Sequence, residues 1–174
     1  MANTWQSASQ GVTFAANKHM LDVFNSSSSA RYVRIYRAYH LNNGTAAITG
    51  VLNTMRVNII TSASAGTAVT PITMDTTNGA LDANTTSGFG RTIGVGNIIR
   101  QVLNSPDEPT LTTLDWDSLM TLIPFGEIWN AGYGDTNIQP VTCRASEGRG
   151  FSVQSITQTV GSNDYEIMFT DSAS

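Results

Sequence analysis

Histidine side chains can bind a metal ion or transfer a proton, so the two histidines of this chain are candidates for a functional site. His19 and His40 are the only two, and neither lies in a paired ligand spacing such as His-Glu-x-x-His. A zinc or catalytic site needs three or four convergent groups, and the sequence offers no obvious third one. We therefore expect both histidines to be structural residues beside strands, and we expect no metal and no cofactor.

Carboxylates could supply the acid and base of a glycoside hydrolase. The candidates are Asp115, Asp117, Glu127 and Glu147. Nothing in their spacing brings two of them together, and a helix start already explains Asp115 and Asp117. No Gly-x-Ser-x-Gly nucleophile turn is present. We expect no catalytic residues and therefore a protein that is not an enzyme.

A glycine-rich run and one cysteine complete the candidates for chemistry. The run from Gly88 to Gly96 lacks the Gly-Lys-Ser/Thr ending of a nucleotide-binding loop, and Ile93 stands where the third glycine of a dinucleotide fingerprint should be. A bent strand or hairpin explains it better. The single Cys143 excludes an internal disulfide and a cysteine-rich zinc site, so we expect a small buried strand residue.

The most unusual segment is Arg31-Tyr-Val-Arg-Ile-Tyr-Arg-Ala-Tyr-His40, which alternates basic and aromatic residues. On a regular strand, Arg37 and Tyr39 would share a face with Ile35, whereas Arg34 and Tyr36 would lie on the other face. Such a strand could stack single-stranded nucleic acid or contact a protein, where Tyr and Arg are enriched. The acidic charge balance favours the protein contact. A plain sheet face, with arginine stems covering tyrosine rings, stays open.

The composition indicates that strands must position these residues. Of 174 residues, 54 are Ser, Thr or Asn, and Thr, Val and Ile total 47 against 9 Leu. Residues branched at the β-carbon favour strands over helices, so a helical bundle or a coiled coil is excluded. The formal net charge of −4 argues against a general nucleic-acid binder, which is normally basic. No run approaches the roughly 20 apolar residues of a membrane span.

Turn signals divide the chain into short segments of strand type, which is typical of a sandwich or barrel. We predict eight to ten antiparallel strands, over residues 12–16, 20–24, 31–41, 46–60, 68–74, 93–103, 125–130, 138–144, 151–160 and 165–170. One short helix is predicted at 115–122, because Trp116, Leu119, Met120 and Ile123 share one helical face and Pro124 ends it. Residues 75–90 are expected to form a long exposed loop. We expect a single domain over 1–174, in which residues 1–10 can form an extended arm. The first residues lack a secretory signal pattern, so we expect folding in a cytoplasm.

Several short runs resemble those of β-rich structural proteins of tailed-phage virions, such as capsid decoration, head fibre or tail proteins. The runs are Arg34-Ile-Tyr-Arg37, Leu41-Asn-Asn43, Ala46-Ala-Ile-Thr-Gly-Val51, Val69-Thr-Pro71, Ser105-Pro-Asp-Glu-Pro109, Trp116-Asp-Ser-Leu119, Ile128-Trp129, Gly132-Tyr-Gly-Asp135, Gln139-Pro140 and Arg144-Ala-Ser-Glu-Gly148. The resemblance implies a structural role in the virion, and it brings no catalytic residue.

Our leading hypothesis is an all-β, jelly-roll-like antiparallel sandwich with one short helix, acting as a capsid decoration or cement protein. It would form a homo-oligomer, a trimer by analogy, and contact the major capsid protein or another virion protein, without membrane or nucleic acid. The interface residues would be Arg34, Tyr36, Arg37 and Tyr39. One alternative is a carbohydrate- or receptor-binding module of a tail or fibre, in which Trp116, Trp129 and Tyr133 stack on the ligand. Another is a coat protein that alone forms a shell.

Overall fold

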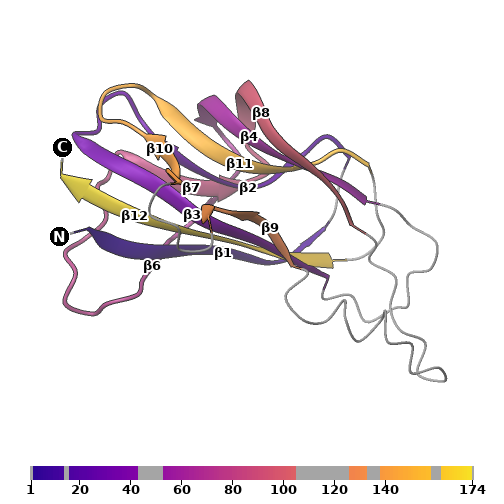
Figure 1. Ribbon diagram of the computed structural model, residues 1–174, viewed down its shortest axis with the longest axis horizontal. Helices are drawn as coiled ribbons and strands as arrows, with labels where there is room; N and C mark the ends of the chain where they lie inside the picture. The colour runs from indigo at the N-terminus through magenta and orange to yellow at the C-terminus, as the bar shows by residue number, and fades with distance from the viewer. Residues whose placement is uncertain are drawn as a thin grey trace.

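The structure is a computed structural model that describes residues 2–13, 16–42, 53–104, 126–132, 138–157 and 162–173. Most of this part is β-strand, arranged as two antiparallel sheets that face each other as a sandwich (Figure 1). No helix long and apolar enough to cross a membrane occurs among these residues. The all-β prediction is confirmed.

Each sheet has six strands. Sheet A has the order β10-β3-β12-β1-β6, with β9 also paired to β3, and sheet B has the order β5-β7-β2-β11-β4-β8. The strands of sheet A are β1 (Asn3–Thr13), β3 (Arg31–Asn42), β6 (Ile72–Thr73), β9 (Glu127–Asn130), β10 (Val141–Cys143) and β12 (Ser162–Ala173). Those of sheet B are β2 (His19–Asn25), β4 (Asn53–Ser64), β5 (Thr67–Val69), β7 (Thr85–Phe89), β8 (Thr92–Asn104) and β11 (Arg149–Ser155). The described part of the chain thus contains twelve strands, more than the eight to ten predicted.

The order of the strands is that of a jelly roll. β1 pairs with β12, β2 with β11, β3 with both β9 and β10, and β4 with β8. When the short strands β5, β6 and β7 are left out and β9 and β10 are taken as one position, eight positions remain. The first then lies beside the last, the second beside the seventh, the third beside the sixth and the fourth beside the fifth. β12 also pairs with β3, and β11 with β4, which joins these pairs into two sheets. This nesting of antiparallel pairs across two sheets defines the jelly roll, as predicted.

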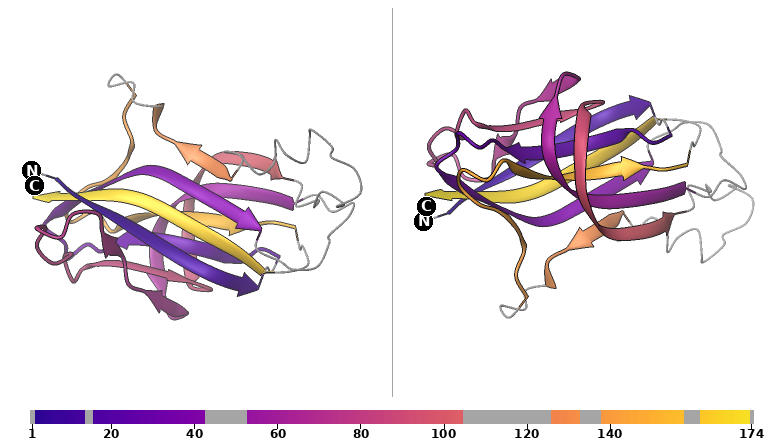
Figure 2. Two further views of the ribbon diagram at one scale, coloured as in Figure 1. Left: turned by 90° about the horizontal axis from the view of Figure 1, so that it is seen from below. Right: turned by 90° about the horizontal axis from the view of Figure 1, so that it is seen from above.

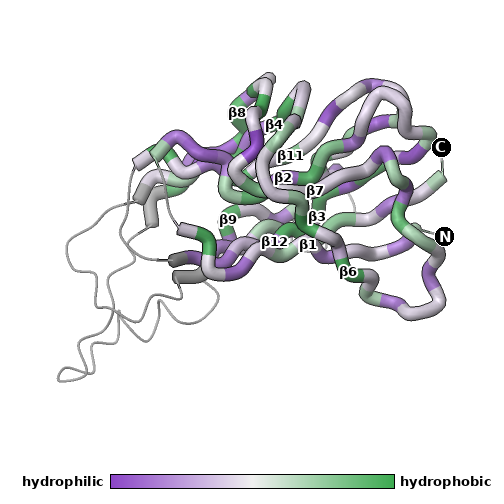
Figure 3. Tube along the Cα trace, turned by 180° about the vertical axis from the view of Figure 1, so that it is seen from behind, coloured by the Kyte–Doolittle hydropathy of each residue, from purple (hydrophilic) through white to green (hydrophobic). Residues whose placement is uncertain are grey.

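The core lies between the sheets, because alternate side chains on each strand point inward. Sheet A contributes Trp5, Val33, Ile35, Ile167 and Phe169, and sheet B contributes Leu21, Val23, Val57, Phe151 and Val153. Hydrophobic and hydrophilic positions alternate along the strands in Figure 3. Each large side chain fully buried in this way contributes about 1.5–3 kcal/mol.

Three parts of the chain differ from the sequence prediction. The first residues are no arm, since β1 begins at Asn3 and pairs with β12. The predicted loop 75–90 contains strand β7, which pairs with β2. The predicted strand 68–74 is two short strands separated at Pro71, with β5 in sheet B and β6 in sheet A. The predicted helix at 115–122 and the first residues of the predicted strand 46–60 lie outside the described residues.

Strands β4 and β8 bend strongly, as Figure 2 shows in its right-hand view. Their pairing contains three register shifts, between Val57 and Asn58, Ile59 and Ile60, and Ile60 and Ser62. Each shift inserts an irregularity that increases local twist and bends the strand. Ile60, which lies at two of these shifts, is fully buried although it does not belong to the central hydrophobic cluster.

Candidate functional site

Strand β3 holds the four predicted interface residues and contains a bulge in their middle. Met168 of β12 lies opposite Arg37, and Phe169 lies opposite Ile35, so Tyr36 is the extra residue. An extra residue reverses the alternation of side chains beyond it. Arg37 and Tyr39 therefore do not share a face with the buried Ile35, as regular alternation predicted.

The bulge gathers all four residues on the outer face of sheet A. The inward side chains of β3 are Val33, Ile35, Ala38 and His40, all buried. Arg34, Tyr36 and Tyr39 are partly exposed, and Arg37 is exposed. Their cross-strand partners on β12 are Thr170, Met168 and Glu166. We call the set Tyr32, Arg34, Tyr36, Arg37, Tyr39, Glu166, Met168 and Thr170 the β3 face.

The β3 face extends across the rest of sheet A. Figure 2, left view, shows β12 lying between β1 and β3. Gln6 of β1 pairs with Met168 on one side and with Ile72 of β6 on the other. Ile72 is 67% exposed, so an apolar side chain stands at the far edge of the same row. A continuous face that combines tyrosines, arginines and exposed aliphatic groups is typical of a protein contact.

Neighbouring side chains hold part of this face in place. The Arg34 guanidinium donates a hydrogen bond to the Ser172 hydroxyl at 3.0 Å and lies 5.6 Å from the centre of the Tyr32 ring. The Tyr39 hydroxyl donates to Glu127 Oε2 at 3.4 Å. Neither of the two ion pairs among the described residues involves Arg37.

The two histidines lie inside the sandwich. His19 Nδ1 is 2.9 Å from the Ser152 hydroxyl, and burial lowers the pKa of His19 to about 4. His40 stacks on Tyr165 with ring centres 5.0 Å apart, and its Nε2 is 2.9 Å from Asn163 Oδ1. Burial lowers the pKa of His40 as well. Among the described residues, no three His, Cys, Asp or Glu side chains come together as a metal site would require.

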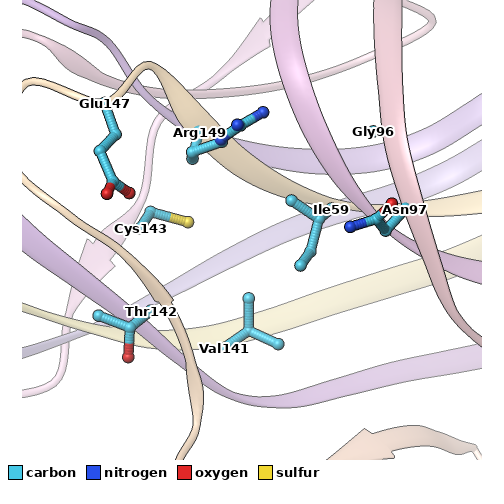
Figure 4. Close-up of a pocket in the computed structure, with 8 residues that line it drawn as sticks. All are labelled: Ile59, Gly96, Asn97, Val141, Thr142, Cys143, Glu147 and Arg149. Carbon is cyan, nitrogen blue, oxygen red and sulfur yellow. The ribbon is translucent and has the colours of Figure 1, made fainter.

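Cys143 lies in a cavity of about 450 Å³ between the edges of the two sheets (Figure 4). The cavity is lined by Ile59, Gly96, Asn97, Val141, Thr142, Cys143, Glu147 and Arg149. Cys143 is buried, as predicted. Burial, with a smaller effect of the Glu147 charge, raises the pKa of its thiol to about 12. The thiol is therefore protonated at neutral pH and is a poor nucleophile.

The other sequence candidates are dispersed. Glu127 accepts hydrogen bonds from Tyr39 and Asn130, whereas Glu147 lines the cavity, and Asp115 and Asp117 lie outside the described residues. Trp129 is partly buried and tilts against the core residue Phe151 at 6.3 Å between ring centres. Trp116 and Tyr133, the other two residues proposed to stack on a ligand, also lie outside the described residues.

The glycine-rich run joins the end of β7 to the start of β8. It is not a hairpin, because β7 pairs with β2 and β5 whereas β8 pairs with β4. Gly90 has a φ of 62° between β7 and β8. A Cβ atom on Gly88 would lie 2.7 Å from Arg91 Nε, so the missing side chain leaves room for the arginine. Arg91 thereby reaches the buried carboxylate of Asp22. Sequence reasoning missed this pair, because 69 positions separate the two residues.

Comparison of this chain with protein-family models, with curated proteins and with solved structures gives no match.

Proposed function

We propose that this protein is a non-enzymatic structural protein of a bacteriophage virion, a capsid decoration protein that binds the particle surface. The observation that carries the proposal is the β3 face, on which a bulge displays Arg34, Tyr36, Arg37 and Tyr39 together. The jelly-roll order of the strands supports it, because this fold is common in viral capsid domains. That support is an analogy at the level of fold. The resemblance of short sequence runs to virion proteins points the same way.

The chemistry of the β3 face suits a protein partner. Tyrosine rings bury apolar area, and guanidinium groups make planar hydrogen bonds, so both residue types dominate binding energies at interfaces. Arg34 is already held by Ser172 and Tyr32, which lowers the entropy lost on binding. The partner would be a sister copy in a homo-oligomer, a trimer by analogy, or the capsid protein beneath.

The test uses Tyr36→Ala and Arg37→Ala, with Arg56→Ala as the control. Arg56 is a partly exposed residue of sheet B that bonds Gln101, away from the β3 face. Light scattering gives the oligomeric state, and sedimentation with phage particles gives binding. Each β3-face variant should lose about 2 kcal/mol of binding free energy, which lowers the affinity more than tenfold. The control variant should bind normally. If both variants stay folded and assemble and bind like the wild type, the β3 face is not the interface.

A carbohydrate- or receptor-binding module of a tail or fibre is the second candidate. The cavity beside Cys143 favours it, because Asn97, Thr142, Glu147 and Arg149 offer hydrogen bonds in a space of about 450 Å³, and jelly rolls also occur as lectin domains. Isothermal titration of a sugar panel against the wild type and Glu147→Gln would test it. Electron microscopy of the purified protein tests the third reading, since closed shells would identify a self-assembling coat protein.

A further inference from the structure

Strand β8 is a long open edge of sheet B. It lies at the end of the strand order beside β4 (Figure 1), and it pairs with no other strand among the described residues. Its 13 residues contrast with the other edges of the two sheets, where β5 and β10 have 3 residues each, β6 has 2 and β9 has 4. One side of β8 therefore presents backbone N–H and C=O groups to which a further strand can bond.

The sequence of β8 lacks the usual protection of an open edge. Natural proteins protect such edges with charged side chains, above all lysine, with proline or with very short strands. β8 contains no proline and no lysine, and Arg100 is its only charged residue. Gly94 and Gly96 leave part of the strand without side chains that would hinder a neighbouring strand.

A bulge in β8 brings two exposed aliphatic side chains together at this edge. On a regular strand Val95 and Ile98 would lie on opposite faces, because three positions separate them. Gly96 is an extra residue in the pairing with β4, so Val95 lies opposite Ile60 and Ile98 lies opposite Asn58. Because these two partners are alternate residues of β4, Val95 and Ile98 share one face. Val95 is 45% exposed and Ile98 is 55% exposed, so the bulge adds apolar surface to the open edge.

We propose that β8 pairs with β8 of a second copy of this chain, antiparallel and about a two-fold axis, so that two six-stranded sheets become one continuous sheet. With the axis between Val95 and Ile98, each of these side chains meets the other one in the partner copy, which removes apolar surface from water. The same axis places the two Arg100 cations toward opposite ends of the contact, so they do not repel each other across it.

A second copy fits this edge better than a strand of another protein does. A two-fold contact uses the same surface on both partners, so one pairing covers both open edges and assembly closes at two copies. Because β8 carries a single charge, it gives a charged foreign strand little electrostatic attraction. Other copies of the chain are also present as soon as it folds, when the open edge first needs a partner.

This inference goes beyond the role in a virion and does not depend on it. The contact uses sheet B, whereas the β3 face lies on sheet A. A dimer formed through β8 therefore leaves the β3 face free to bind a particle. A two-fold dimer also differs from the trimer that analogy predicts.

The test uses two double variants with opposite charges at the contact. One carries Val95→Lys and Ile98→Lys, and the other carries Val95→Glu and Ile98→Glu. Light scattering should give the wild type twice the monomer mass of 18.6 kDa. Each double variant alone should pair more than tenfold more weakly, since like charges meet at the contact. An equimolar mixture of the two should pair again, because lysines then meet glutamates.

The control variant is Met74→Lys. Met74 follows β6 and is 55% exposed, so this change replaces an equally exposed apolar side chain away from β8. It should keep the mass of the wild type.

Hydrogen exchange locates the contact. Amides of β8 should exchange more slowly as the concentration of the wild type rises, and they should not do so in the lysine variant. If the charged variants fail to fold by circular dichroism, this dependence in the wild type decides alone. The proposal is overturned if the wild type is a monomer at all concentrations, if exchange in β8 does not depend on concentration, or if folded charged variants assemble like the wild type or do not pair when mixed. No phage particle is used, so these outcomes are independent of the particle-binding test of the β3 face.

Discussion

Arg91 Nη1 lies 2.7 Å from Asp22 Oδ1, and the Asp22 side chain is fully buried in sheet B. Burial raises the pKa of Asp22 to about 6, and the nearby Arg91 charge limits that rise. Asp22 Oδ2 and Arg91 Nε have no hydrogen-bond partner among the described residues. The hydrogen bond between them therefore compensates only part of the cost of burying the two charges, and removing either residue leaves the other charge unpaired.

Removing the arginine should destabilise the protein more than removing both charges. In Arg91→Met the Asp22 carboxylate stays buried without a cation, so we expect a loss of about 3–5 kcal/mol in the free energy of unfolding. Adding Asp22→Asn to that variant should restore part of the loss. Urea unfolding followed by circular dichroism measures both, with Arg56→Ala as a partly exposed control. A loss below about 1 kcal/mol for Arg91→Met would show that Asp22 does not rely on this pair.

His19 should make the protein less stable in acid. Burial lowers its pKa from 6.5 to about 4 in the folded state, so between these values the unfolded chain binds more protons. Stability should therefore fall as the pH drops from 6.5 to 4, by up to about 3 kcal/mol. His19→Gln should flatten the dependence of Tm on pH over this window. Some slope should remain, because burial lowers the pKa of His40 too. An unchanged slope in His19→Gln would contradict the assignment.

Asp22 should have the opposite effect from His19 and stabilise the folded protein in acid, over a similar pH range. Its folded-state pKa of about 6 lies above the ordinary value of 3.8, so the folded protein binds the extra proton between these values. Its contribution to stability is thus full below pH 3.8 and is lost as the pH rises through 6. Asp22→Asn should remove this gain and make the acid-side fall in Tm steeper than in the wild type. A shallower fall would mean that Asp22 stays ionised in the folded state to lower pH.

The sequence predicted a β-sandwich or barrel because its strands bury alternating apolar residues, as in Phe151 and Val153. Strand β1 escaped prediction because its inward positions include Ser7 and Ser9, whose polarity hides the alternation. Strand β7 was missed for the same reason, since its buried residues are Thr85, Ser87 and Gly88. Small hydroxyl side chains can be buried where they form hydrogen bonds, as the Ser7 and Ser87 hydroxyl oxygens do, which lie 2.5 Å apart.

The candidate face was predictable by residue type and not by geometry. The composition of the segment from Arg31 to His40 led us to predict a contact strand. Its faces could not be assigned, because a bulge depends on how β3 pairs with β12, and only the fold brings these strands together.

Gly150 offers a test of the packing between β11 and its neighbours. A Cβ atom at this position would lie 2.5 Å from the Val23 carbonyl oxygen and 2.8 Å from Ile60 Cγ1. The first contact is with backbone, which cannot move aside without disturbing the pairing of β2 and β11. Gly150→Ala should therefore cost about 1–3 kcal/mol in the free energy of unfolding. Gly79→Ala is the matched control, because a Cβ atom there meets nothing within 4 Å. Equal urea midpoints for the two variants would show that β2, β11 and the bend of β4 pack more loosely at Gly150 than these distances require.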